Sequence, residues 1–277
     1  MSNPIVVGID GSAHAWRALD WAADRAVRHG LDLRLVHGSR AVAEDGHISP
    51  RALRPLVAER EDLLAEARQY ALKIHPDLRI ETRLLPLEPG RALVREGENA
   101  DMVTVGSRGL GGFEGLLFGS VGLYTAAHAV CPVLVVSRSA PYPADAAAEI
   151  VVGVEGRPGD DAAVEWAFKE AASKGADILA LHAVGGEIGF PRWRVIEDME
   201  LSQALAGMGA RYPDVPVRPL ISDRTPSQAL VEASEKAGLI VLGARRRRGV
   251  LGMALGRVNH AVLHHARCPV LIVPTGE

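Results

Sequence analysis

Several features that mark other classes of protein are scarce or missing in this chain of 277 residues. Aromatic residues make up only 4%, which argues against a surface that stacks nucleic-acid bases. The formal net charge of −3 supplies no general attraction to nucleic acid or to an anionic membrane. No apolar run is long enough to span a bilayer, and an apolar strand begins at Ile5 with no signal peptide before it. We therefore predict a cytoplasmic protein that binds neither nucleic acid nor membrane.

Cysteine is also scarce. The two cysteines, Cys131 and Cys268, each begin a Cys-Pro-Val-Leu segment. Equivalent places in two similar segments favour two small buried hydrophobic side chains over a disulfide, as does a reducing compartment.

The sequence lacks the common catalytic motifs of nucleotide and ester chemistry. No G-x4-G-K-[ST] segment offers a lysine to the β- and γ-phosphates, and no G-x-S-x-G elbow is present. Without an evident general base or charge clamp, fast phosphoryl transfer is not expected. We predict a protein that is not an enzyme.

What the chain does contain is an internal repeat. Ile5–Gly11 matches Ile150–Gly156 at an offset of 145, and Val133–Val136 matches Val270–Val273 at an offset of 137. Between the copies lies a short segment with Pro141 and Pro143, typical of a linker. We predict two domains, 1–139 and 149–277, joined by a linker at 140–148.

Each copy alternates apolar strands with helical segments. In the first copy we expect strands at Ile5–Ile9, Leu33–His37 and Ile80–Leu85, and helices from Ser12 to Gly30, near 51–74, near 91–98 and from 121 to 129. Continuous Val/Ile/Leu strands indicate burial on both faces and therefore a parallel sheet. The predicted fold is α/β, with two tandem doubly wound lobes, each a five-stranded parallel sheet flanked by helices.

A glycine-rich segment follows the fourth apolar run of the first copy. It reads Gly106-x2-Gly109-x9-Gly119-Ser120 and precedes a helix. Glycine lets backbone N–H groups approach a bound group, and the following helix N-terminus favours an anion. Asp10 and Gly38 also follow strands, so the ends of three strands converge on a nucleotide-sized site.

These segments resemble the universal stress proteins in their tandem form. The resemblance rests on Val-Gly-Ile-Asp-Gly-Ser at 7–12, Leu-Val-His at 35–37, the G-x2-G-x9-G-Ser segment and Cys-Pro-Val-Leu-Val-Val at 131–136. It covers nearly the whole chain and implies adenine nucleotide α-hydrolase-like, Rossmann-like lobes of the ATP-binding branch. It also implies a role in stress response.

The resemblance implies ATP as the ligand, accompanied by Mg²⁺ or Mn²⁺. Asp10 would meet the ribose or, indirectly, the metal through a phosphate, and the backbone at Gly38 would meet adenine. The glycine-rich segment would wrap the phosphates. The implied nucleotide-binding residues are Gly8, Asp10, Gly38, Gly106, Ser107, Arg108, Gly109, Gly119 and Ser120.

The second copy departs from this pattern. Its candidate contacts are Gly153, Gly243 and Gly256, while Asp10 is replaced by Glu155, Gly109 by Arg246 and Ser120 by Arg257. Either this copy has lost or weakened ATP binding, or Arg245–Arg248 and Arg257 grip phosphates by charge. We favour loss, because the backbone cradle is the damaged part, and because an arginine with positive φ would be uncommon.

Two other clusters in the second copy have simpler interpretations than ligand sites. The Arg245–Arg248 run is interpreted as a phosphate or lobe contact, not as a nucleic-acid patch, because no aromatic residue interleaves with it. His260 and His264 have zinc-like spacing, but without a third ligand they are interpreted, with His265, as helix-surface or interface residues.

Three functions stay possible at this stage. The first is ATP binding by the first lobe, with conformation or assembly signalling to unidentified protein partners. The second is a slow ATPase or self-phosphorylating enzyme that uses Asp10, Ser107 or Ser120. The third is a nucleotide-free scaffold. The resemblance also implies an internal pseudo-dimer through Val133–Val136 and Val270–Val273, and a homodimer of chains is compatible with it.

Overall fold

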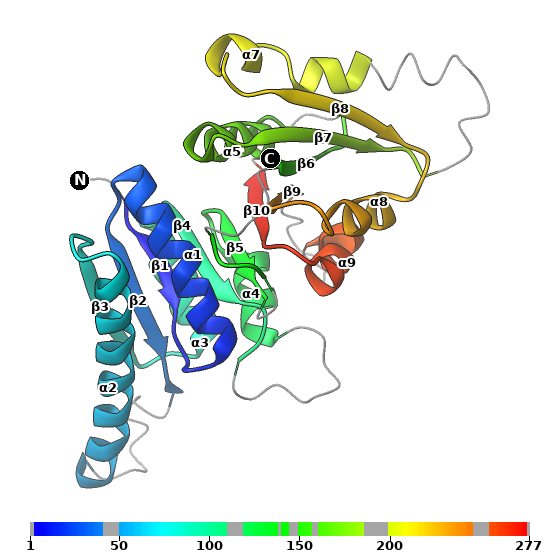
Figure 1. The fold of residues 1–277 in the computed structure, drawn as a ribbon. Coiled ribbons are helices and arrows are strands. Elements are labelled where there is room, and N and C mark those ends of the chain that lie inside the picture. Colours follow the sequence, from blue (N-terminus) through cyan, green and yellow to red (C-terminus); the bar gives the residue numbers. More distant parts are fainter. Residues whose placement is uncertain are drawn as a thin grey trace. The chain divides into compact units, whose positions relative to one another are not determined.

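A computed structural model describes residues 3–40, 50–109, 119–137, 140–143, 149–156, 160–185, 199–245 and 255–275 (Figure 1). The chain divides into two compact units, Met1–Pro143 and Ala144–Glu277, called unit 1 and unit 2 below. No helix in the described ranges has the length and apolar character needed to cross a membrane.

Unit 1 is a five-stranded parallel sheet with helices on both faces. Its elements are β1 (Ile5–Gly8), α1 (Ala13–His29), β2 (Leu33–Gly38), α2 (Pro50–Ile74), β3 (Ile80–Leu85), α3 (Pro89–Gly97), β4 (Met102–Gly106), α4 (Ser120–His128) and β5 (Val133–Val136). The strand order is β3-β2-β1-β4-β5, and every pair is parallel. The predicted doubly wound α/β fold is confirmed for this unit.

The boundaries of α1 follow from its capping residues. Ser12 is the N-cap, and its side chain accepts a hydrogen bond from the Ala15 N–H at 3.2 Å. Gly30 is the C-cap with φ 63°, the left-handed conformation that glycine adopts without a Cβ clash. Both predicted ends of this helix are confirmed.

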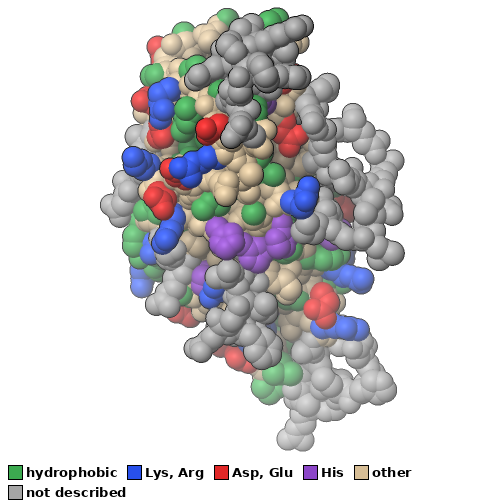
Figure 2. All heavy atoms as spheres, turned by 90° about the vertical axis from the view of Figure 1, so that its right-hand side faces the viewer, with side chains coloured by type: hydrophobic (Ala, Val, Ile, Leu, Met, Phe, Trp, Pro, Cys, Tyr) green, Lys and Arg blue, Asp and Glu red, His purple; other side chains and the backbone are tan. Residues whose placement is uncertain are grey.

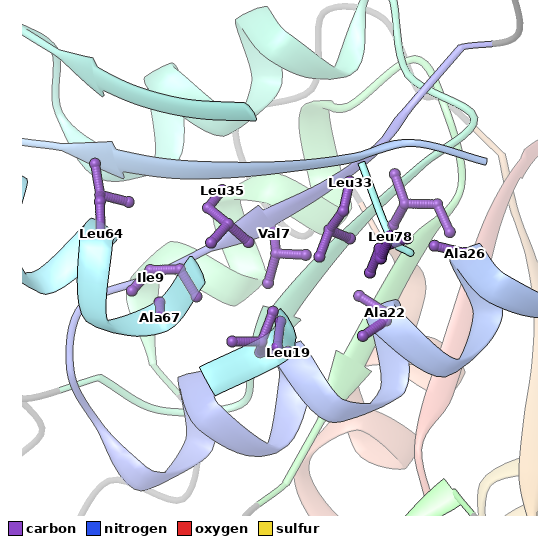
Figure 3. Close-up of a cluster of buried hydrophobic side chains, with 13 residues drawn as sticks. Val7, Ile9, Leu19, Ala22, Ala26, Leu33, Leu35, Leu64, Ala67 and Leu78 are labelled. Carbon is purple, nitrogen blue, oxygen red and sulfur yellow. The ribbon is translucent and has the colours of Figure 1, made fainter. Parts of the chain in front are cut away.

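The apolar core of unit 1 lies between the sheet and helices α1 and α2. Side chains of β1, β2 and α1, among them Val7, Leu19 and Leu35, are fully buried there (Figure 3). The second helix adds Leu64 and Ala67 to the same cluster. Burial of this apolar surface fixes α1 and α2 on the sheet, and α3 and α4 pack against each other and the sheet.

The chain reverses direction across the sheet between β1 and β4. From β1 it runs outward through β2 to β3, then crosses back to β4 and continues to β5. Because all strands are parallel, their carboxyl ends share one edge of the sheet. The crevice beside the reversal point at that edge is where such folds bind ligands.

Unit 2 repeats this architecture. Its elements are β6 (Glu149–Val154), α5 (Asp160–Lys174), β7 (Asp177–Ala183), α7 (Met208–Arg211), β8 (Val217–Ser222), α8 (Pro226–Ala233), β9 (Leu239–Arg245), α9 (Gly256–His265) and β10 (Val270–Thr275). The strand order is β10-β9-β6-β7-β8, again with parallel pairs. The central strand β6 is therefore the counterpart of β1.

The same histidine contact recurs in both units. Nδ1 of His37 lies 2.7 Å from the carbonyl oxygen of Ile9, and Nδ1 of His182 lies 2.8 Å from that of Val154. A carbonyl oxygen only accepts, so each imidazole donates and ties the end of the second strand to the first. This shared bond gives both histidines a role in the fold.

Both cysteines are free and buried, as predicted. Cys131 is 7% exposed and Cys268 is 4% exposed. Burial raises the pKa of the Cys268 thiol to about 12, so almost none of the reactive thiolate forms at ordinary pH. We expect a thiol reagent such as Ellman's reagent to react with neither cysteine in the folded protein and with both in guanidinium. Rapid reaction of the folded chain would contradict this burial.

Candidate functional site

Unit 1 contains a cavity of about 360 Å³ at the carboxyl edge of its sheet, beside the reversal point. The ends of β1, β2 and β4 and the first turns of α3 and α4 form its walls. The lining residues are Gly8, Ile9, Asp10, Ala15, Val36, His37, Gly38, Pro89, Leu93, Val105, Gly106, Arg108, Gly109, Gly119, Ser120, Val121 and Gly122. Eight of the nine residues expected in the first-copy site are among them.

Asp10 lies at the carboxyl end of the central strand and faces this cavity. Its Oδ1 accepts a hydrogen bond from the Ser12 N–H at 2.9 Å, which holds the carboxylate at the turn before α1. Ser12, and not Asp10, is the N-cap of α1.

Gly109 approaches Asp10 so closely that a Cβ at this position would overlap with Oδ2 of Asp10. The φ of Gly109 is not positive, since positive φ values in the described residues occur at other glycines. Close approach, and not a left-handed backbone, is therefore the reason for glycine here. The expectation that a positive φ disfavours arginine applies to Arg246, which lies outside the described residues, and it stays a prediction.

Three other glycines at the cavity are required by helix packing. A Cβ on Gly8 would lie 3.0 Å from Cδ1 of Leu93, and a Cβ on Gly38 would lie 2.7 Å from the Pro89 Cα. A Cβ on Gly106 would lie 2.7 Å from the carbonyl carbon of His14. These positions bring α3 and the first turn of α1 against the strand ends, which shapes the cavity before any ligand enters.

Ser107 is the one expected first-copy residue that does not line the cavity. It is 7% exposed, and its hydroxyl oxygen lies 3.1 Å from Nδ1 of His14. Its backbone N–H donates to Val136 at 2.8 Å, and its carbonyl accepts from the Gly119 N–H at 2.7 Å. Ser107 thus joins the two ends of the glycine-rich segment and positions its neighbours.

Gly119 and Ser120 begin α4 at the cavity wall. Gly119 is the N-cap, without a side-chain capping bond, and Ser120 is the first helical residue. The alternative in which Ser120 is the N-cap is therefore wrong. Its exposed hydroxyl lies beside the first N–H groups of the helix, which have no partner within the helix and favour an anion.

Most of the remaining lining residues are apolar and were not singled out from the sequence; His37 is the polar exception. Val36 and Val105 come from strand ends, and Pro89 and Leu93 come from the first turns of α3. Strand periodicity predicts the valines as core residues, but no local signal shows that they border a cavity. Apolar walls with a few polar groups at one end are typical of small-molecule sites of about 300–1,000 Å³.

The counterpart edge of unit 2 has a different backbone. Gly256, aligned with Gly119, is the first residue of α9 and has φ 73°, whereas Gly119 has φ −83°. The carbonyl oxygen of Gly243 accepts from Nδ2 of Asn259 at 2.9 Å. A Cβ on Gly153 would lie 2.7 Å from a Leu242 methyl, so this glycine serves packing.

Arginines 246–248 lie outside the described residues, so the contrast between Gly109 and Arg246 stays a prediction. Arg257 is exposed in the first turn of α9. The choice between a lost site and a cationic pocket in unit 2 rests on the sequence alone.

The three histidines of α9 lie together on its surface, and Figure 2 shows histidine side chains gathered in one patch. The ring centroids of His260 and His264 are 4.4 Å apart, and those of His264 and His265 are 6.3 Å apart. Burial, and then the charge of its two neighbours, lowers the pKa of His264. No group of three or more His, Cys, Asp or Glu side chains in the described ranges is arranged to hold a metal ion.

Taken together, each unit is a doubly wound parallel α/β domain, and unit 1 has a glycine-lined cavity at its carboxyl edge. The family model of the universal stress proteins matches residues 1–137 and 148–274. The chain therefore belongs to the universal stress protein family, in its tandem form.

One relative and two solved structures serve for comparison with this chain. Universal stress protein Rv2005c of Mycobacterium tuberculosis is 34% identical over 296 residues, covering 98% of this chain and 99% of that protein. A crystal structure of a universal stress protein from Archaeoglobus fulgidus covers 100% of this chain and 98% of its own, at 20% identity and TM-score 0.76. Another structure from Archaeoglobus fulgidus, in complex with dAMP, is 25% identical over 48% of this chain and 97% of its own, with TM-score 0.38.

Proposed function

We propose that unit 1 binds an adenine nucleotide, with ATP as the preferred ligand, and that occupancy alters conformation or assembly. The observation that carries the proposal is the cavity at the strand reversal, which gathers eight of the nine residues implied by the family motif. Its apolar end, at Val36, Pro89 and Leu93, suits a base. Its polar end, at Asp10, Arg108 and the start of α4, suits ribose and phosphates.

The polar end also fits a divalent cation that travels with the nucleotide. The cavity offers one carboxylate, Asp10. Mg²⁺ commonly keeps several water ligands and binds through one or two carboxylates and substrate phosphates, so a single carboxylate is sufficient. The ion would neutralise phosphate charge, while Asp10 would orient it and Arg108 would add a positive side chain nearby.

Signalling without turnover is favoured over catalysis. The Ser107 hydroxyl, one of the candidate acceptors of a phosphoryl group, is buried against His14 and does not reach the cavity. A response by binding alone requires only that the nucleotide prefer one of two conformations. Association of the two units through their last strands, and of two chains into a homodimer, remain predictions.

We expect ATP to stabilise the full chain against unfolding. A ligand at a hundredfold excess over its Kd adds about 2.7 kcal/mol to the free energy of unfolding of the unit that binds it. Thermal unfolding with ATP, AMP or cAMP, each with and without Mg²⁺, measures this effect, and native mass spectrometry gives the stoichiometry. One nucleotide per chain is the expected result.

The same measurements distinguish nucleotide binding from the alternative functions. Absence of any shift with all three nucleotides would contradict nucleotide binding and favour the scaffold. ADP formation that is lost in Asp10→Ala would favour the slow ATPase. Two nucleotides per chain would overturn the view that unit 2 has lost its site.

A further inference from the structure

Residues 140–143, at the end of unit 1, lie against α1. Ala140 is 2% exposed, and the indole N–H of Trp21 donates to the Pro141 carbonyl oxygen at 3.0 Å. The next residue, Tyr142, has its ring 3.3 Å from the guanidinium carbon of Arg17. This short segment is called the α1 strap below.

The two halves of the strap are held with different strength. Trp21 is 2% exposed and its N–H donates to the Pro141 carbonyl oxygen, so release of Pro141 would remove a hydrogen bond from a buried side chain. Tyr142 is 49% exposed and contributes one cation–π contact. Ala140 and Pro141 therefore anchor the strap, and Tyr142 is its tip, which can move away from α1.

Two nitrogen atoms of Arg17 lack a hydrogen-bond partner among the described residues while Tyr142 covers the guanidinium group. Its Nε and Nη1 are buried without a hydrogen-bond partner among the described residues, and Nη1 is 3.8 Å from Oδ2 of Asp20. The Tyr70 hydroxyl already donates to Oδ1 of Asp20 at 2.8 Å. Release of Tyr142 would let water reach the Arg17 N–H groups, which offsets the lost cation–π contact.

The N-terminal turn of α1, close to Arg17, supports the cavity. The Ser12 hydroxyl donates to the carbonyl oxygen of Arg108 at 3.3 Å, and Nδ1 of His14 lies 3.1 Å from the Ser107 hydroxyl. Arg17 follows His14 by three residues, which is less than one helical turn. A single rigid stretch of helix therefore contacts both the glycine-rich segment and the strap.

We propose that nucleotide binding in unit 1 and docking of Tyr142 on α1 favour each other, so that the strap responds to occupancy of the cavity. This inference rests on the proposed function. A nucleotide that fixes Arg108 and Gly109 also fixes the first turn of α1, and an ordered α1 loses less entropy when Tyr142 docks. By linkage, docking must then strengthen nucleotide binding by the same factor.

A cavity of about 500 Å³ beside the tip gives Tyr142 room to move. It lies between α1 and α2, and Tyr142 forms one of its walls together with Trp16 and Tyr70. The rings of Trp16 and Tyr70, which line the same cavity, pack edge to face with their centroids 5.2 Å apart. Movement of the tip therefore requires no repacking of the core.

Calorimetric titration of the full chain with ATP and Mg²⁺ tests the coupling. We expect Tyr142→Ala to weaken ATP binding about fivefold, the lower part of the range for coupled sites, and Tyr142→Phe to restore it because the ring remains. Tyr212→Ala in unit 2 is the matched control, because the Arg211 guanidinium also lies near that ring, 5.7 Å from its centroid. The control should bind ATP like the unmodified chain.

Fluorine NMR of the chain labelled with 3-fluorotyrosine follows Tyr142 without a substitution, so the response to ATP is measured on the unmodified sequence. The Tyr142 signal, assigned by its loss in Tyr142→Phe, should shift towards the docked position when ATP is added. A chain that binds no adenine nucleotide would contradict the proposed function itself. A chain that binds ATP with no change in this signal, and with equal affinity in Tyr142→Ala, would overturn the coupling alone.

Discussion

Gly109→Arg is expected to abolish nucleotide binding while unit 1 stays folded. A Cβ at Gly109 overlaps only with the end of the flexible Asp10 side chain, which can turn away. The arginine side chain would then enter the cavity and displace the carboxylate from its polar end. The same residue type stands at the equivalent position of the second copy, Arg246.

Thermal unfolding with saturating ATP and Mg²⁺ measures this loss. The variant should lack the stabilisation of about 2.7 kcal/mol expected at a hundredfold excess over Kd, while its melting temperature without nucleotide changes little. Gly209→Arg is the matched control, because nothing lies within 4 Å of a Cβ built on that exposed glycine. A full ATP-dependent shift in Gly109→Arg would mean that the cavity is not the nucleotide site.

Asp101→Ala is expected to destabilise unit 1 by about 3–5 kcal/mol, because it removes a carboxylate that forms an ion pair with a buried arginine. The Arg25 side chain is 2% exposed, and its Nη2 lies 3.3 Å from Oδ2 of Asp101. Asp101 immediately precedes β4, and its N–H donates to the Pro4 carbonyl oxygen at 2.9 Å. The pair therefore ties α1 to the strand that carries the glycine-rich segment.

Urea unfolding followed by fluorescence of the α1 tryptophans measures this destabilisation. Asp24→Ala is the control, since Asp24 forms an ion pair with Arg28 at 2.9 Å on the surface of the same helix. That pair is shorter but partly exposed, and surface pairs contribute at most about 1 kcal/mol. Equal losses for the two variants would show that burial of Arg25 does not decide the contribution of its partner.

Local sequence signals predicted the fold well because they report local physics. Apolar runs such as Val133–Val136 are buried along their whole length, as expected for strands covered on both faces. Ser12 and Gly30 set the ends of α1 through backbone geometry that depends only on neighbouring residues. The parallel, doubly wound class of each unit followed from this pattern, whereas the order of the strands came from the structure.

The site was predicted less completely, because its details depend on contacts between distant segments. The motif located the strand ends, but it predicted the same role for all the glycines, namely close approach of the backbone to a bound group. A Cβ would meet a packed helix at Gly8, Gly38 and Gly106, whereas at Gly109 it would meet the Asp10 carboxylate. No spacing rule connects His14 with Ser107, which are 93 residues apart and meet only in the folded unit.

Some structural features lacked any sequence signal. Arginine is usually exposed, and nothing near Arg25 indicates that Asp101, far along the chain, would pair with it in the interior. Likewise, prolines marked 140–148 as a linker, but the packing of Pro141 onto Trp21 requires the three-dimensional position of α1.

The histidine contact shared by the two units helps to distinguish residues required by the fold from residues required by a ligand site. His37 and His182 make the same bond to the preceding strand end, although only unit 1 keeps the intact glycine-rich segment. Duplication thus left one chain with two versions of each position. Where both versions agree, as at these histidines, a shared contact in the fold explains the residue. Where they differ, as at Gly109 and Arg246, we expect that only unit 1 keeps the constraint of a nucleotide site.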